Sequence, residues 1–231
     1  MLLLLFTSML SFAQNGLGTW NVTNINAKLN DKWNVFTEVQ LRSLSFYNQF
    51  HYYEYKGGVT YKISKNYSVT TGIGSYNTFS EGGNFETPIK NQEVRTWIQI
   101  NMKNPIEWLT FEHRYRAEQR FTSNGYKNRF RYRISATVPL NNKKIEPKTV
   151  YALIWNEIFF TDNEPYFERN RLLIGGGYEF SDKIAVQIGY IYQFDYKIND
   201  ETGRDFLNLS LLYNFNLSKK STKEFNPTTS D

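Results

Sequence analysis

The sequence contains no cysteine and only two histidines among its 231 residues. Without cysteine, the chain can form no disulfide framework and cannot carry a lipid anchor on a cysteine side chain. It also lacks an apolar run of the roughly 18 residues that a membrane-spanning helix needs. No stretch shows the helical periodicity of a recognition helix, so we expect no nucleic-acid partner.

The charge balance is equally uninformative about partners. The formal net charge is +5 and the pI is about 9.1. Lys and Arg are spread over turns and alternating positions and do not form a basic arm. Two separated histidines do not make a metal site, and no glycine-rich phosphate loop opens a helix. The sequence therefore predicts no metal, no cofactor and no catalytic residues.

Aromatic residues are abundant, at 17% of the chain, and they alternate with charged residues. Residues 109–121 place mostly apolar and aromatic side chains on one phase, and the other phase carries Glu112, Arg114, Arg116, Glu118 and Arg120. Residues 129–138 repeat this pattern. Because successive strand residues point to opposite faces, each strand is apolar on one side and charged on the other. Long strands of this kind, separated by polar turns, are typical of transmembrane β-barrels.

The alternation continues along the chain and predicts eleven strands. They cover residues 19–29, 33–45, 50–62, 67–78, 92–102, 108–121, 129–140, 149–160, 167–180, 184–196 and 205–217. Tight turns alternate with longer polar connections, except that the long connection 141–148 falls where a short one is expected. Single-chain bacterial barrels have even strand numbers, so we expect an antiparallel meander of ten or twelve strands within residues 14–217.

The two ends of the chain differ from this pattern. Residues 2–12 form an apolar run, and Ser11-Phe12-Ala13 matches a small-x-small cleavage site, although a basic segment before the run is missing. We expect residues 1–13 to be a signal peptide and residues 218–231 to be a disordered polar tail. Together with the strands, this predicts a location in the outer membrane of a Gram-negative bacterium, with membrane lipid as the partner.

The charged phase must face the barrel interior, because an Arg facing lipid near the bilayer midplane costs about 2–4 kcal/mol. We therefore expect a lumen charge network. Its members are Glu93, Arg95, Glu112, Arg114, Arg116, Glu118, Arg120, Arg129, Arg131, Arg133 and Glu157. A turn centred near residues 124–125 would place Glu118 opposite Arg131. Seven Arg then meet four Glu, so the remaining positive charge requires water, another carboxylate such as Glu38, or a small bound anion.

Several regions resemble the bacterial family catalogued as domain of unknown function 2490. They are Gly18-Thr19-Trp20, Lys32-Trp33 with Glu38 and Arg42, Glu93–Trp97, His113–Phe121, Arg129–Arg133, Asn156–Phe159 and Asn170–Leu172. The segment with alternating Arg, residues 113–121, is the most specific of these. The resemblance spans nearly the whole mature chain and implies an outer-membrane barrel, with no established activity.

Three functions remain open from the sequence. The network can fill a narrow lumen and act structurally, since small barrels are filled by side chains. It can instead form a narrow, porin-like pore that prefers anions, because rings of Arg select anions. An outer-membrane lipid-modifying enzyme would need a Ser/His pair, and His113 lies on the apolar phase. A soluble calyx-like barrel is the alternative fold, and it requires an apolar interior.

Overall fold

The computed structural model describes residues 16–198 and 201–218, which form eleven β-strands. The strands are β1 (Leu17–Lys28), β2 (Trp33–Ser45), β3 (Asn48–Lys62), β4 (Tyr67–Ser80), β5 (Glu86–Ile106), β6 (Leu109–Thr122), β7 (Gly125–Pro139), β8 (Val150–Thr161), β9 (Phe167–Ser181), β10 (Ile184–Asp195) and β11 (Thr202–Asn216). The expected signal peptide, residues 1–13, lies outside the described residues, and so does the expected tail beyond residue 218. Among the described residues, no helix is long and apolar enough to cross a membrane.

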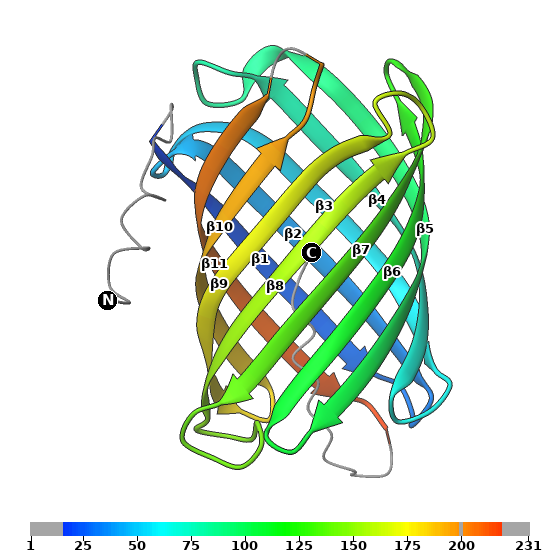
Figure 1. Cartoon of the computed structure of the whole chain (residues 1–231), viewed down its shortest axis with the longest axis vertical. Helices are drawn as coiled ribbons and strands as arrows, with labels where there is room; N and C mark the ends of the chain where they lie inside the picture. The colour runs from blue at the N-terminus through cyan, green and yellow to red at the C-terminus, as the bar shows by residue number, and fades with distance from the viewer. Residues whose placement is uncertain (1–15, 199–200, 219–231) are drawn as a thin grey trace, which may run out of the picture.

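Each strand pairs with its neighbours in sequence, and the sheet closes into a barrel (Figure 1). Closure is made by β1 and β11, which run parallel from Leu17 opposite Asp205 to Lys28 opposite Asn216. The expectation of ten or twelve strands was therefore wrong, although each of the eleven predicted segments contains a strand. An even number is required only when the two closing strands must run antiparallel. A parallel ladder also pairs the backbone N–H and C=O groups of both edges, so eleven strands close the sheet.

The β6–β7 hairpin has a different register from the expected one. Thr122 pairs with Gly125, so the connection is the two residues 123–124, and Glu118 lies opposite Arg129. Gly125 has a φ of 111°, which side chains rarely adopt, and the Thr122 hydroxyl accepts a hydrogen bond from the Asn124 backbone N–H at 3.0 Å. The hairpin connection therefore lies slightly nearer residue 122 than the composition of the loop indicated.

The two faces of the barrel wall have opposite chemistry. Along the middle of the described strands, outward positions carry aliphatic, aromatic, Thr, Ser, Gly and a few amide side chains together with His113, and none carries Lys, Arg, Asp or Glu. Ile73, Ile98 and Ile188, for example, are each more than half exposed on this outer surface. The charged residues of the same strand segments face inward and are buried. This distribution is the reverse of that in a soluble calyx.

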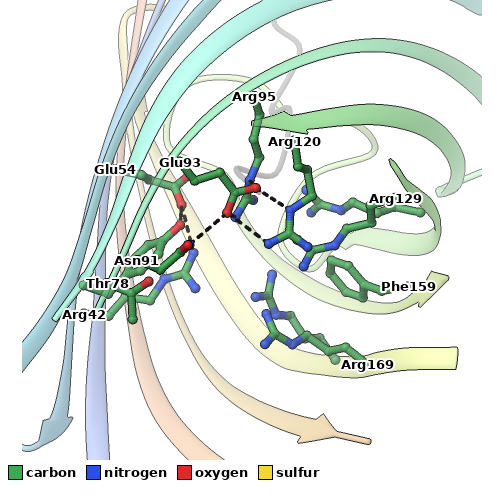
Figure 2. Close-up of a pocket in the computed structure, with 13 residues that line it drawn as sticks. Arg42, Glu54, Thr78, Asn91, Glu93, Arg95, Arg120, Arg129, Phe159 and Arg169 are labelled. Carbon is green, nitrogen blue, oxygen red and sulfur yellow. Dashed lines mark hydrogen bonds and ion pairs between the residues drawn. The ribbon is translucent and has the colours of Figure 1, made fainter. Parts of the chain in front are cut away.

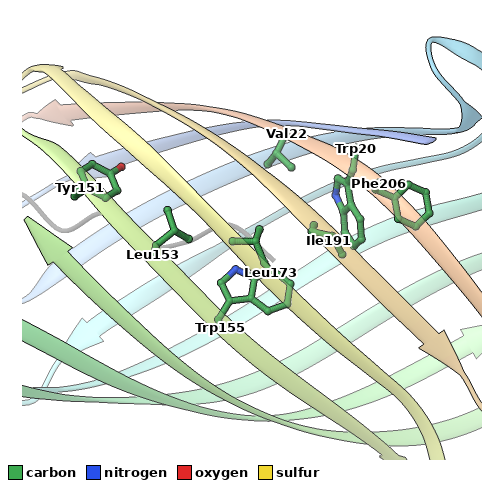
Figure 3. Close-up of a cluster of buried hydrophobic side chains, with 8 residues drawn as sticks. All are labelled: Trp20, Val22, Tyr151, Leu153, Trp155, Leu173, Ile191 and Phe206. Carbon is green, nitrogen blue, oxygen red and sulfur yellow. The ribbon is translucent and has the colours of Figure 1, made fainter. Parts of the chain in front are cut away.

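Part of the interior is apolar. A buried cluster on β1 and β8–β11 faces the lumen; it consists of Trp20, Val22, Tyr151, Leu153, Trp155, Leu173, Ile191 and Phe206 (Figure 3). Ile145, in the long β7–β8 connection, packs against this cluster. The unexpectedly long connection therefore contributes a side chain to the interior at one end of the barrel.

Two inward glycines allow large side chains to fill the lumen. A Cβ atom at Gly72 would lie 2.2 Å from the ring of Trp97, and one at Gly177 would lie 2.3 Å from the ring of Tyr151. Both distances are far shorter than a normal van der Waals contact. Each aromatic ring therefore occupies the space that a side chain would fill if the glycine on the neighbouring strand were a larger residue. At these two points the lumen is accordingly filled by an aromatic side chain.

Candidate functional site in the barrel lumen

The inward face of β5–β8 carries the Arg and Glu residues of the expected network, which we call the charged wall. Its members are Glu93, Arg95, Glu112, Arg114, Arg116, Glu118, Arg120, Arg129, Arg131, Arg133 and Glu157. All of them are buried except Arg120, whose side chain is 13% exposed. Because the strands are adjacent and the inward positions recur every second residue, the charges form a continuous patch on one side of the lumen.

Glu157 and Glu118 occupy the centre of the charged wall. Arg131 donates two hydrogen bonds to Glu157, at 2.9 and 3.0 Å, and a third to Glu118 at 2.7 Å. Arg114 also donates to Glu157. Glu118 lies within 4.0 Å of nitrogen atoms of Arg116, Arg129 and Arg95 as well. Sharing of each carboxylate by several guanidinium groups allows like charges to lie opposite each other in the ladder, as Arg116 and Arg131 do.

Glu93 pairs with two Arg near one end of the wall. Arg95 donates to it at 2.6 and 2.9 Å, and Arg120 donates to it from the adjacent strand, with one bond of 2.9 Å. The other end of the wall is less densely charged. There, Glu112 accepts a 2.8 Å hydrogen bond from Asn101 and lies 3.6 Å from Lys103.

A second set of buried charges lies on β2 and β3. The Lys56 ammonium bridges Glu38 and Glu54, at 2.7 Å to each carboxylate. Glu54 also lies 3.2 Å from Arg42 and accepts a hydrogen bond from the Tyr52 hydroxyl. Glu38 therefore pairs within its own part of the wall and does not reach across the lumen to the charged wall.

Aromatic rings from the apolar side lie directly against the guanidinium groups. Trp20 lies between Arg42 and Arg171, whose guanidinium carbons are 3.4 and 4.8 Å from the ring centroid. Arg131 lies 4.7 Å from the Phe159 ring, and Arg133 lies 5.3 Å from the Trp155 ring in the same way. Such cation–π contacts favour a desolvated cation and join the two sides of the lumen.

An arginine pocket of about 100 Å³ lies at the end of the barrel where β6 turns into β7 (Figure 2). Seven Arg line it, together with Tyr52, Glu54, Thr78, Asn91, Glu93 and Phe159; the seven are Arg42, Arg95, Arg120, Arg129, Arg131, Arg169 and Arg171. The Arg169 side chain is 22% exposed, whereas that of Arg131 is 2% exposed. The pocket therefore opens toward this end and has its floor at Arg131.

Polar contacts between strand ends and loops connect the segments around the mouth of the pocket. Arg204 forms an ion pair with Glu81 at 2.7 Å, which joins the segments on either side of the β1–β11 closure. The Asn128 side chain donates to Asp162 at 2.6 Å, and this hydrogen bond holds the pKa of the Asp162 carboxyl below its ordinary value. The pocket is therefore framed by ordered polar contacts.

The sequence reasoning missed several lumen residues. Arg42, Glu54, Lys56, Arg169 and Arg171 all face the interior but were not included in the network. The sequence did contain a signal for their inward position, because each of these residues follows the same two-residue alternation as the charged wall. On these strands the inward phase mixes charged residues with uncharged ones such as Gln40, Tyr52 and Leu173. Composition therefore did not separate the two faces as clearly as on β6 and β7.

The two histidines occupy separate environments. His113 faces outward, where its Nδ1 lies 2.9 Å from the Tyr132 hydroxyl. His51 is buried near the start of β3, where its ring lies beside Tyr52. Within residues 16–198 and 201–218, no group of three His, Asp, Glu or Cys side chains could hold a metal ion.

The fold and site define a class of protein: a closed meander β-barrel with a buried Arg/Glu network in its lumen. The family model described as "Protein of unknown function (DUF2490)" matches residues 17–204. The chain therefore belongs to this family, as the resemblance in its Arg-rich segments indicated. No curated protein and no solved structure matches the chain significantly.

Proposed function

We propose that this protein is an outer-membrane β-barrel of a Gram-negative bacterium whose lumen is closed by its own side chains. The observation that carries the proposal is the reversed chemistry of the wall, apolar outside and charged inside. An outward Arg near the bilayer midplane would cost about 2–4 kcal/mol, whereas the observed outer surface presents none along its middle. The apolar segment at residues 2–12 and the cleavage motif that follows it support export.

The packed interior supports a structural, non-conducting role for the charge network. Glu157 and Glu118 bind several Arg at once, and the aromatic rings of the opposite side cover the guanidinium groups. A barrel of eleven strands is closer in size to the eight-stranded barrels that side chains fill than to the porins of about sixteen strands that enclose an aqueous channel. Each of these contacts reduces the space available to a hydrated ion.

A narrow anion-preferring pore is the second candidate, and the arginine pocket favours it. Seven Arg at one mouth would attract anions, because a low-dielectric channel focuses the field of its charges. Conduction requires a continuous passage beyond the pocket floor at Arg131. The two candidates therefore differ in whether the reconstituted protein carries current.

The enzyme alternative is disfavoured by the outward position of His113 beside Tyr132.

Site-directed spin labelling tests the membrane placement directly, and the absence of native cysteine makes single labels possible. We expect a label at Ile134 of the reconstituted protein to be accessible to oxygen dissolved in lipid and protected from a water-soluble nickel complex. A label at the neighbouring inward position, Ser135, should be protected from lipid-dissolved oxygen. Equal oxygen accessibility at both positions, or preferential exposure of Ile134 to the nickel complex, would contradict the proposal.

A further inference from the structure

The charges around the arginine pocket do not balance. The seven Arg that line it share carboxylates with Arg114 and Arg116, which gives nine guanidinium groups. Their carboxylate neighbours include Glu54, Glu93, Glu118, Glu157, Glu168 and Asp195. Over the described part of the chain, nine Arg and Lys side chains are buried against seven Glu, and the partly exposed Arg120, Arg169, Glu168 and Asp195 add two charges of each sign, so the interior has an excess of two positive charges. An excess of this size in a buried site is costly without a counter-ion.

The donors around the pocket suit an oxyanion. Each guanidinium carries five N–H donors in a planar fork that matches the geometry of phosphate or carboxylate oxygens. The Thr78 hydroxyl and the Asn91 amide line the same space and supply uncharged donors. Glu93 and Glu168 each already pair with two Arg, through hydrogen bonds or ion pairs. A group with several acceptor oxygens and more than one negative charge is therefore the best complement.

The pocket has the size and access for such a group. Its volume is about 100 Å³, whereas a single water needs roughly 10–15 Å³ of such space. It opens at the barrel end where Arg169 is partly exposed, so a ligand can enter from solution or from the adjacent membrane surface. A phosphate monoester carries a charge of about −1.5 to −2 at neutral pH and fits both the charge excess and the volume.

We propose that the arginine pocket binds a phosphate monoester group, either of a soluble molecule or of a lipid headgroup. Arg171 is the informative position in this site. It is buried, it donates to the Gln193 amide oxygen at 2.8 Å, and its guanidinium lies against Trp20 and Phe159. Arg171 also lines the pocket, so its guanidinium contributes a positive charge and planar N–H donors to this space. Binding at this mouth does not depend on whether the barrel conducts.

Calorimetric titration of inorganic phosphate into the detergent-folded protein, at constant ionic strength, tests the soluble source. Arg171→Gln should weaken binding about 10- to 100-fold, the range expected for loss of a charged hydrogen bond. Lys103→Gln is the control, because it also removes one cation but lies beside Glu112 at the other end of the wall and does not line the pocket. Its affinity should stay within about 3-fold of the native value, a difference too small for a lost direct contact. If Arg171→Gln does not fold, Thr78→Val removes a lining donor without changing its shape and should weaken binding about 2- to 10-fold.

The lipid source is tested by reconstitution into phosphatidylcholine vesicles with and without phosphatidic acid, whose headgroup is a phosphate monoester. A rise in the unfolding temperature with phosphatidic acid that Arg171→Gln abolishes and Lys103→Gln retains assigns the lipid source. Saturable binding of inorganic phosphate with the same variant pattern assigns the soluble source. Absence of both responses, or equal losses in the two variants, would overturn the proposal.

Discussion

At the scale of single residues, the lumen is organised by a few carboxylates that each serve several Arg. Glu157 is fully buried and accepts hydrogen bonds from Arg114 and Arg131. Replacing such a carboxylate leaves buried guanidinium groups without compensation, which is far more damaging than losing an exposed ion pair. The stability of the barrel should therefore depend strongly on this one side chain.

We predict that Glu157→Ala lowers the free energy of unfolding by about 3–5 kcal/mol, the cost of removing one partner of a fully buried pair. Urea titration of the vesicle-inserted protein, read by heat-modifiable gel mobility, measures this loss. The control is Glu146→Ala, because Glu146 is exposed and its nearest cation, Lys144, is 3.7 Å away and also exposed. That change should alter stability by less than about 0.5 kcal/mol. Equal stability of Glu157→Ala and the native protein would show that the network is not structural.

At the scale of strands, the alternation on β6 and β7 was sufficient to predict which residues face inward. The inward Arg and Glu of these strands are buried, and Phe130 is half exposed on the outer surface. Register was not predictable to the same accuracy, because it depends on the backbone conformation at Gly125. The apolar cluster around Trp20 was also not foreseen, since an inward Trp and an outward Trp look alike in the sequence.

The parallel closure is the least expected feature of the strands, and it can be tested by crosslinking. Asn21 and Leu209 are paired in the β1–β11 register. With no native cysteine to interfere, Asn21→Cys combined with Leu209→Cys should form a disulfide on oxidation, because directly paired residues lie within bridging distance. A faster-migrating band on a non-reducing gel reports the bridge.

A mismatched pair provides the control for this crosslink. Asn21→Cys combined with Ile174→Cys joins β1 to β9, which is not its neighbour in the barrel. This second pair should remain reduced under the same conditions. Failure of the β1–β11 pair to form, with both variants folded, would contradict closure by eleven strands and favour an additional strand between them.

At the scale of the whole molecule, the interior joins three components: the charged wall, the Lys56-centred charges of β2 and β3, and the apolar cluster. Arg133 of the charged wall lies against Trp155 of the apolar cluster, and Arg42 and Arg171 lie against Trp20 of the same cluster. The arginine pocket lies in this interior, at the end of the barrel where β6 turns into β7. We therefore propose a molecule that combines an outer surface suited to lipid with a lumen closed by side chains and an anion-binding pocket at one mouth.

Single-channel recording in a planar lipid bilayer most directly tests the proposal that side chains close the lumen. Heat-modifiable gel mobility of the same preparation verifies that the barrel has inserted. We predict that the native protein carries almost no current. Arg133→Ala should raise the conductance, because it removes a buried guanidinium from beside Trp155. Stable open-channel current through the native protein, with anion preference reduced by the same substitution, would contradict a closed lumen and identify a pore.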